Sequence, residues 1–536
     1  MDDDASLTPP RGIRRLLLGA VSGLLAGYAA IAVAELVSAA VRPESGPIIA
    51  VGGAAIDRTP PAVKDWAIRQ FGTNDKLVLQ LGILAVLTLL SLVLGMVAAR
   101  WRLIGSLGVL AFGVVGALAA TGRTDSTSAM DALPSLVGAV VGGCLLYWLI
   151  GRLGHSRAVD EDCGTAASEA GGPGWDRRGF IIAATAAAAA STGAGLAGRA
   201  LNGSQGQNAV ASRKNVMLPA PASSAAAVPK GAALRIDGIS PFVTPNSDFY
   251  RVDTALVVPK VDAASWKLRI HGMGVTRELT LSFDDLLKMP LIERDITLTC
   301  VSNEVGGPYV GNARWIGVRL ADLLEQCGVR PPSKGGPADQ LVARSVDGMT
   351  IGSPVDDVMD GRDAMLAVGM NGQPLPFEHG FPVRMVVPGL YGYVSACKWI
   401  QDIELTTFDS YDSYWVERDW AQRAPIKTES RIDTPKPFGR PKAGNVMVAG
   451  VAWAQHRGID KVEVRVDDGP WEEARLAAED TRDTWRQWSY PWQATKGGHT
   501  LTVRATDRTG ETQTQKRTDT IPDGASGWHS VVVTVD

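Results

Sequence analysis

Long apolar runs dominate the first two hundred residues of the chain. Each is nearly free of charged residues and approaches the roughly 20 residues that an α-helix needs to cross about 30 Å of hydrocarbon. The pattern therefore predicts a membrane region over residues 1–200 with about five transmembrane helices. The runs cover 16–37, 77–99, 103–120, 133–150 and 180–196.

Arginines between these runs predict an orientation. Lys and Arg accumulate in short cytoplasmic segments beside membrane helices. In a chain of five alternating helices, the arginine sets before the first helix, between the second and third, and between the fourth and fifth all fall on one side. We therefore expect a cytoplasmic N-terminus, with everything after about residue 200 on the extracytoplasmic side. The sets include Arg14 and Arg15, Arg100 and Arg102, and Arg152.

Arg177 and Arg178 stand directly before the fifth apolar run, which is rich in alanine. An arginine pair before a stretch of modest hydrophobicity resembles a twin-arginine export signal, an address that a receptor reads. An ordinary positively charged flank of a membrane helix is the alternative. These residues alone leave both interpretations open.

Beyond the membrane region the apolar pattern becomes shorter and mixed. Residues 201–235 are rich in Ala, Ser, Gly, Asn and Pro without periodic apolar positions, which predicts a flexible linker. From 236 to 428, alternating runs typical of strands mix with amphipathic helical segments, which predicts an α+β domain. The clearest strands are 266–271 and 296–300, and the clearest helices are 282–290 and 318–327.

The last hundred residues, 429–536, contain strand patterns only. Short alternating segments at turn-like spacings are typical of a β-sandwich. An Asp-Gly pair at Asp468 and Gly469 marks a tight hairpin after the segment 459–466. The segments are 445–453, 459–466, 485–490, 499–505 and 528–535.

Composition and charge exclude a nucleic-acid partner and argue against disulfide bonds. The net charge of the 536 residues is only -3, and no basic stripe with interleaved aromatics occurs in the C-terminal half, which excludes a nucleic-acid partner. Five cysteines are too few for a disulfide-rich scaffold. For Cys327 and Cys397 we therefore expect burial rather than a disulfide.

The candidate chemistry centres on Cys300, which follows an extended apolar run. Taken alone, a free cysteine is most often a buried core thiol. Three cationic or ionisable residues follow it in order, however: His379, Arg384 and Lys398. A soft thiolate ligand together with several cationic contacts suits a bulky anionic cofactor that carries a metal.

The local sequences around these residues, 298–303, 379–384 and 392–399, resemble the sulfite-oxidase family of molybdopterin enzymes. The resemblance extends from about 236 to 536 and does not include the helices. It implies a molybdopterin-binding oxidoreductase domain over 236–428. The following β-sandwich at 429–536 resembles the immunoglobulin-like dimerisation domain of that family, which implies a homodimer.

By this resemblance, Cys300 is the protein ligand of the metal in a molybdenum-molybdopterin cofactor. His379, Arg384 and Lys398 match residues that hold the pterin and its phosphate. Asn303 matches a polar residue near the site.

The resemblance also points to residues that contact the substrate. Phe249 and Arg251 match a segment that contributes an arginine to the oxyanion pocket, so we expect both at the cofactor and Arg251 also at the substrate. The chain departs from the family at two positions, where Asp253 replaces a histidine and Trp420 replaces a tyrosine. With Cys300 and Arg251, Trp420 completes the expected catalytic set. An acid near the pocket lowers its attraction for a dianion such as sulfite.

These expectations define a membrane-anchored, extracytoplasmic oxidoreductase that transfers an oxygen atom on a small, sulfite-like oxyanion. The chain has no cytochrome b5-like haem segment, and no histidine lies in the five apolar runs. We therefore expect a separate electron carrier, either a cytochrome or a quinone-linked membrane protein. Two alternatives stay open: a sulfoxide reductase of the same family, and a non-enzymatic envelope protein that kept the fold but lost the metal.

Overall fold

The computed structural model describes residues 11–536 except 61–62, 64–65, 67–69, 72–74, 124–125, 127 and 155–176. The chain divides into two compact units, which we describe separately. The first consists of Met1–Gln207 and the short segment Thr254–Val257. The second consists of Asn208–Asp253 and Val258–Asp536.

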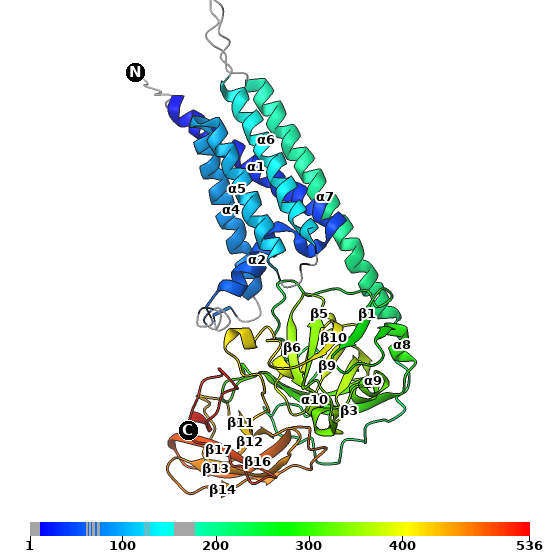
Figure 1. Cartoon of the computed structure of the whole chain (residues 1–536). Helices are drawn as coiled ribbons and strands as arrows, with labels where there is room; N and C mark the ends of the chain where they lie inside the picture. Colours follow the sequence, from blue (N-terminus) through cyan, green and yellow to red (C-terminus); the bar gives the residue numbers. More distant parts are fainter. Residues whose placement is uncertain are drawn as a thin grey trace, which may run out of the picture. The chain divides into compact units, whose positions relative to one another are not determined.

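The first unit is a bundle of long helices (Figure 1). Five helices in the described part of the chain are long and apolar enough to cross a membrane, the number that the apolar runs predict. A further short helix, α2 (Pro47–Arg58), occupies part of the connection that the sequence pattern leaves as a loop. The long helices are α1 (Arg11–Val41), α4 (Asp75–Arg100), α5 (Arg102–Thr121), α6 (Leu133–Gly154) and α7 (Arg177–Asn215).

Small residues allow these helices to approach closely. A Cβ atom added at Gly23 of α1 would lie 2.7 Å from the Cα atom of Gly95 in α4. Packing of this kind, through glycine and alanine, is typical of helices that associate within a membrane. The polar contacts of the bundle include an ion pair of 3.0 Å between Arg42 and Asp131.

The segment after the fifth apolar run differs from the flexible linker that we expected over 201–235. Residues 201–215 continue α7 although they contain two glycines and three asparagines, because tertiary contacts hold the end of the helix. Arg213 donates hydrogen bonds to the backbone oxygens of Leu375 and Pro374. Ser223, further along, forms a β-bridge with Ile292. From Asn208 onward the segment is therefore part of the second unit.

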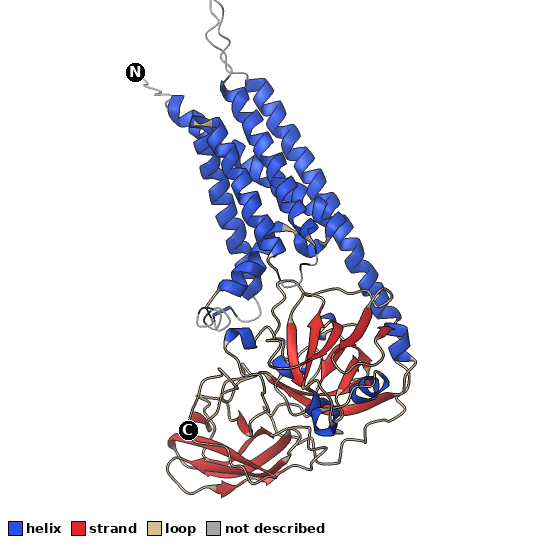
Figure 2. Ribbon diagram, in the orientation of Figure 1, coloured by secondary structure: helices blue, strands red, loops and turns tan. Residues whose placement is uncertain are grey.

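The α+β part of the second unit contains two five-stranded sheets. Figure 2 shows their strands together with short helices. One sheet has the order β2-β1-β10-β5-β6, and the other has the order β3-β4-β7-β8, with β9 paired to β7. The strands of the first sheet are β1 (Lys267–Gly272), β2 (Leu279–Ser282), β5 (Gln340–Ser345), β6 (Thr350–Pro354) and β10 (Ile400–Thr406). Those of the second are β3 (Leu291–Thr299), β4 (Val310–Arg319), β7 (Met365–Met370), β8 (Gln373–Pro374) and β9 (Arg384–Val386).

The predicted helices of this domain occur, but they are shorter. Ser282 caps the first with a capping box, as its sequence predicts. The helix expected at 318–327 begins only at Leu320, because Val318 and Arg319 complete the pairing of β4 with β7. The helices are α8 (Phe283–Leu287), α9 (Leu320–Gln326), α10 (Val355–Met359) and α11 (Gly392–Ser395).

The C-terminal region contains two four-stranded sheets, with orders β11-β12-β16-β15 and β14-β13-β17-β18. Their apolar side chains, including Trp488 and Val503, share one core. All five predicted strands are present in this β-rich region, whereas its immunoglobulin-like character stays a prediction. The strands are β11 (Glu429–Thr434), β12 (Gly444–Trp453), β13 (Ile459–Val466), β14 (Glu472–Glu473), β15 (Arg475–Leu476), β16 (Arg486–Ala494), β17 (Gly497–Asp507) and β18 (His529–Val535).

Candidate cofactor site

Cys300 lies directly after β3, whose full length pairs with β4. Its backbone N–H donates to the Tyr309 carbonyl at 2.9 Å, and its own carbonyl accepts from the Asn303 N–H at 3.0 Å. The Asn303 side-chain oxygen accepts from the Tyr309 N–H at 2.7 Å. Asn303 therefore closes the loop that begins at Cys300. This is a structural role, in addition to the position near the site that the resemblance implies.

The Cys300 side chain is 9% exposed. Burial raises the pKa of its thiol, although hydrogen bonds from Ser302 and the charge of Lys398 act in the opposite direction. A thiolate here therefore needs a bound metal to stabilise it. The described residues contain no group of three or more His, Cys, Asp or Glu that could hold a metal ion. A metal at Cys300 would have to bring other ligands with it, as a pterin dithiolene does.

Cys327 and Cys397 are also buried and free, as expected.

Aromatic rings line the region next to Cys300. The Phe249 ring stacks on Tyr250 at 5.1 Å between centroids and meets the His379 and Trp315 rings edge-on at 5.5 and 5.8 Å. Burial, together with the charge of Cys300, raises the pKa of the Tyr250 hydroxyl. Tyr250 is therefore a neutral O–H donor close to the thiol, which sequence reasoning overlooked although it stands between Phe249 and Arg251.

His379 and Arg384 are in contact in the structure. His379 ends a short 3-10 helix, Phe377–His379, and Arg384 begins β9. Between them Gly380 has a φ of 107°, and a Cβ atom there would lie 3.0 Å from the Cβ of Arg384. Glycine is therefore required for this close approach. Arg384 donates to the His379 carbonyl at 3.2 Å.

Arg384 is 5% exposed, and its guanidinium lies 5.0 Å from the centre of the Trp315 ring. Burial lowers its pKa to about 10. Its Nε has no hydrogen-bond partner among the residues that the structure describes. A buried guanidinium with an unused donor is costly unless an anion pairs with it. The residues present therefore fit the phosphate-bearing pterin that the resemblance implies.

His379 is neutral. Burial and the nearby Arg384 lower the pKa of its imidazole to about 4. Its Nε2 lies 3.0 Å from the carbonyl oxygen of Asn246, which can only accept, so Nε2 carries the proton. Nδ1 is then an acceptor that can receive a hydrogen bond from a bound cofactor.

Lys398 and Arg251 come together on one acid. The Asp253 carboxylate is 2% exposed and accepts from the Lys398 ammonium and from the Arg251 Nε, each at 3.0 Å on the same oxygen. The Arg251 side chain is 39% exposed. Sequence reasoning placed Asp253 near the pocket but not as a buried partner of Lys398, because 145 positions separate the two residues in the chain.

Trp420 belongs to an aromatic cluster with Trp415 and Tyr393, with ring centroids 5.7 and 5.4 Å away. Tyr393 is part of α11 and donates to the Ala421 carbonyl at 2.7 Å. These contacts attach Trp420 to α11. Its part in catalysis stays a prediction.

The β-rich C-terminal region also holds the Cys300 loop, a role that its strand pattern could not reveal. Gln455 donates from its amide to the Thr299 hydroxyl at 2.9 Å. Arg431 donates to the Gly307 carbonyl at 2.8 Å. The His529 ring packs against Gly306, where any Cβ would collide with it.

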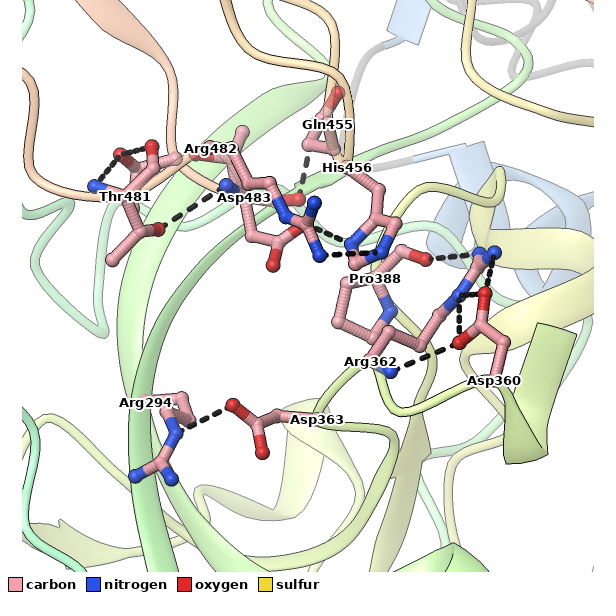
Figure 3. A network of polar contacts seen from close by, with 12 residues as sticks. Arg294, Asp360, Arg362, Asp363, Pro388, Gln455, His456, Thr481, Arg482 and Asp483 are labelled. Atoms are coloured by element: carbon pink, nitrogen blue, oxygen red, sulfur yellow. Dashed lines mark hydrogen bonds and ion pairs between the residues drawn. The ribbon is translucent and has the colours of Figure 1, made fainter.

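Figure 3 shows polar contacts around Arg362 and around His456. Arg362 pairs with Asp360 and donates to the Pro388 carbonyl at 2.9 Å. His456 lies 3.1 Å from Asp483. Arg362 therefore holds Pro388, which lies in the segment that leads into α11.

Comparisons with known proteins identify the family of the α+β part of the chain. The sequence profile described as "Oxidoreductase molybdopterin binding domain" matches residues 255–415. Mitochondrial sulfite oxidase of Rattus norvegicus is 32% identical over 288 residues, which are 46% of this chain and 52% of the rat protein. The uncharacterized oxidoreductase YuiH of Bacillus subtilis (strain 168) is 33% identical over 162 residues, which are 30% of this chain and 75% of that protein.

Among solved structures, the sulfane dehydrogenase SoxCD from Paracoccus pantotrophus is 23% identical and has a TM-score of 0.47, covering 55% of this chain and 84% of its own. The chain spans about half the length of the rat sulfite oxidase that it matches.

The chain belongs to the molybdopterin-dependent oxidoreductases that include sulfite oxidase, and its cofactor is a molybdenum-molybdopterin. The matched range contains Cys300, Arg384 and Lys398 but neither Arg251 nor Trp420.

Proposed function

We propose that this protein is a membrane-anchored, extracytoplasmic enzyme that transfers an oxygen atom to or from a small, sulfite-like substrate. One observation carries the proposal: the buried Cys300 thiol and the buried, incompletely paired Arg384 lie in the segment that matches the molybdopterin family. A bound molybdenum centre supplies exchange of an oxygen atom and two electrons with the substrate.

The residues of the chain hold that group and shape its surroundings. Arg384 suits the phosphate because a guanidinium offers several fixed donors to an oxyanion. Neutral His379 accepts a hydrogen bond through Nδ1, and Lys398 adds a compact charge. Phe249 supplies an apolar wall, and Tyr250 offers a neutral hydroxyl as a donor near Cys300.

The residues on the substrate side carry less net positive charge than a site that binds a dianion tightly. Arg251 is partly solvated and steers an anion toward the site, but Asp253 already balances part of its charge. The same carboxylate pairs with Lys398. This observation favours a monoanionic substrate, or a neutral sulfoxide in the reductase alternative, over a dianion. Trp420 offers an indole N–H at most.

The helices serve as the anchor in this proposal. Five candidate spans, together with the arginines between them, support a cytoplasmic N-terminus and an extracytoplasmic second unit. Electrons pass to or from a separate carrier, either a cytochrome or a quinone-linked membrane protein. The C-terminal sheets, if immunoglobulin-like, support a homodimer.

The molybdenum-to-protein ratio of the full-length chain, purified from a host that makes the cofactor, tests the proposal. We expect a ratio near one in the wild type and an altered or lost metal spectrum in Cys300→Ala. Cys327→Ala, which alters another buried free thiol, is the matched control and should keep the wild-type spectrum. A folded wild-type chain without molybdenum would leave the non-enzymatic alternative.

The direction of oxygen transfer is tested by a substrate screen. Sulfite with an electron acceptor and aromatic or methionine sulfoxides with an electron donor are offered to the loaded enzyme. Turnover of sulfite supports the oxidase, whereas turnover of sulfoxides alone supports the reductase that Asp253 favours.

A further inference from the structure

A cluster of arginines and aromatic rings lies at one end of the helical bundle. Arg100 ends α4 and Arg102 begins α5, with Trp101 between them. The last turns of α6 lie beside this connection, since the Arg102 guanidinium is 3.5 Å from the centre of the Tyr147 ring. Six residues form what we call the arginine–aromatic cluster: Arg100, Trp101, Arg102, Tyr147, Trp148 and Arg152.

Each guanidinium of the cluster lies against an exposed ring. Arg100 is 5.1 Å from the centre of the Trp101 ring, and Arg152 is 4.8 Å from that of Trp148. All three rings are exposed, although they belong to or adjoin helices that are candidate membrane spans. Tryptophan and tyrosine gather at the level of lipid headgroups because their rings are apolar with one polar atom. The rings therefore place the cluster at a membrane interface.

The α6 backbone holds the Arg102 side chain in position. Its Nε donates to the Tyr147 carbonyl. A Cβ atom added at Gly151 would lie 2.3 Å from one of its terminal nitrogens and 2.6 Å from its Cζ. Any side chain at position 151 would therefore displace the guanidinium. Arg102 is thus fixed between α5 and α6, unlike an arginine that only flanks a helix.

The charge of Arg102 is not balanced within the described part of the chain. No acid among the described residues forms an ion pair with Arg100 or Arg102, whose printed contacts are to rings and to one carbonyl. Arg42, in the same bundle, pairs instead with Asp131 at 3.0 Å. A guanidinium offers parallel donors to two phosphate oxygens, and basic pockets between membrane helices bind anionic headgroups. The cluster therefore has the charge that a lipid phosphate requires.

Apolar side chains continue from the cluster along α5. Leu103, Ile104 and Leu107 follow Arg102 directly, and all three are exposed. Leu103 and Leu107 are four residues apart and so share one side of the helix. Acyl chains of a lipid whose phosphate lies at Arg102 can pack on this surface.

We propose that the arginine–aromatic cluster binds an anionic phospholipid, whose phosphate pairs with Arg102 between α5 and α6 and whose acyl chains lie along Leu103 and Leu107. The inference rests on the membrane anchor of the proposed function. In the orientation given there, the cluster faces the cytoplasm, so the lipid belongs to the cytoplasmic leaflet. Bound in this way, the lipid ties the connection between α4 and α5 to the end of α6.

Native mass spectrometry of the full-length chain, titrated in detergent with phosphatidylglycerol or phosphatidylcholine, tests the inference. We expect the chain to bind phosphatidylglycerol more tightly than phosphatidylcholine. Arg102→Gln should lower the phosphatidylglycerol affinity by about tenfold to a hundredfold, the range for hydrogen bonds to a charged group. Excess inorganic phosphate should not displace the lipid, since it makes no acyl contacts. Displacement by phosphate would assign the site to a soluble anion and overturn the lipid.

Arg14→Gln is the matched control, because it removes the same charge from an exposed position near the start of α1. That position lies at the same end of the bundle, since a Cβ atom at Gly19 of α1 would lie 2.7 Å from the Cβ of Ala99 in α4. The control should keep the wild-type affinity. Equal loss in both arginine variants would reflect general attraction to an anionic surface and would overturn a defined site.

Gly151→Ala tests the position of the guanidinium without changing the charge. The added Cβ displaces Arg102, so the phosphatidylglycerol affinity should fall although every arginine remains. Alanine favours a helix, and elution in size-exclusion chromatography verifies that each variant is folded. An affinity equal to that of the wild type in both Gly151→Ala and Arg102→Gln overturns the inference.

A separate measurement distinguishes this inference from the proposed function. A chain that alkaline washing extracts from vesicles contradicts the membrane anchor itself. A chain that stays in the membrane and holds molybdenum, but binds both lipids equally, overturns only the lipid site. A chain that binds phosphatidylglycerol through Arg102 without holding molybdenum supports the lipid site and contradicts the enzymatic part of the proposed function.

Discussion

Arg384 and Arg251 both belong to the proposed site, but their surroundings differ. Arg384 is 5% exposed, with a donor unpaired among the described residues and a pKa lowered to about 10. The Arg251 side chain is 39% exposed and already paired with Asp253 at 3.0 Å. A charge buried without a partner destabilises the empty protein, so it is expected where an anion stays bound. A solvated, paired charge suits an anion that arrives and leaves.

Replacing Arg384, the buried arginine, should have the largest effect. Arg384→Leu should lower cofactor affinity by about tenfold to a hundredfold, since a hydrogen bond to a charged group contributes about 1.5–3 kcal/mol. Molybdenum content after dialysis measures it. Arg440→Leu, which alters an exposed arginine paired with Asp536, is the control and should retain the metal. Equal loss in both variants would contradict the distinction between the two arginines.

Asp253→Asn tests the acid that pairs with Arg251, the exposed arginine of the comparison. Removing the shared carboxylate frees Arg251 and Lys398 for anions, so inhibition by sulfate should strengthen by about tenfold. The measurement is the sulfate inhibition constant at fixed ionic strength. Asp248→Asn, an exposed neighbour, should leave that constant unchanged. An unchanged constant in Asp253→Asn would show that this acid does not set the charge of the pocket.

Arg251→Gln should have a smaller effect. We expect KM for an anionic substrate to rise by about threefold to fivefold, with kcat and molybdenum content unchanged, because exposed ion pairs contribute up to about 1 kcal/mol. The effect should shrink with added salt, which screens exposed charges. Loss of molybdenum in this variant would place Arg251 with Arg384 as a cofactor ligand.

Glu429, the first residue of β11, extends the comparison to a buried acid without a hydrogen-bond partner among the described residues, and the expected effect is on thermal stability. Its folded-state pKa is raised from 4.5 to about 8, so the folded protein favours the protonated form and loses stability as pH rises between these values. Glu429→Gln should therefore unfold a few degrees above the wild type at pH 9, with the difference vanishing near pH 4. Scanning calorimetry across this range measures it. A difference independent of pH would contradict the titration.

The sequence predicts the local parts of this site better than its long-range partners. Cys300 could be placed at a strand end, and Arg384 beside His379, because short-range pattern and spacing decide both positions. The pairing of Asp253 with Lys398 depends on a contact across the fold, which no periodicity encodes. The same limit applies to Gln455, which reaches Thr299 from a region that its alternating pattern assigned only to strands. Composition also misled at 201–215, where tertiary contacts extend a helix.

β12 ends in Trp453, which lies on a C-terminal strand but packs in the core of the α+β domain together with Trp485. Side chains from both sides of residue 428 therefore share one core, although the strand pattern changes there. A gene fusion that exchanged the C-terminal sheets for an unrelated module would open a hole of indole size in the redox domain. Cutting the chain at residue 428 would therefore also remove side chains from the core of the α+β domain.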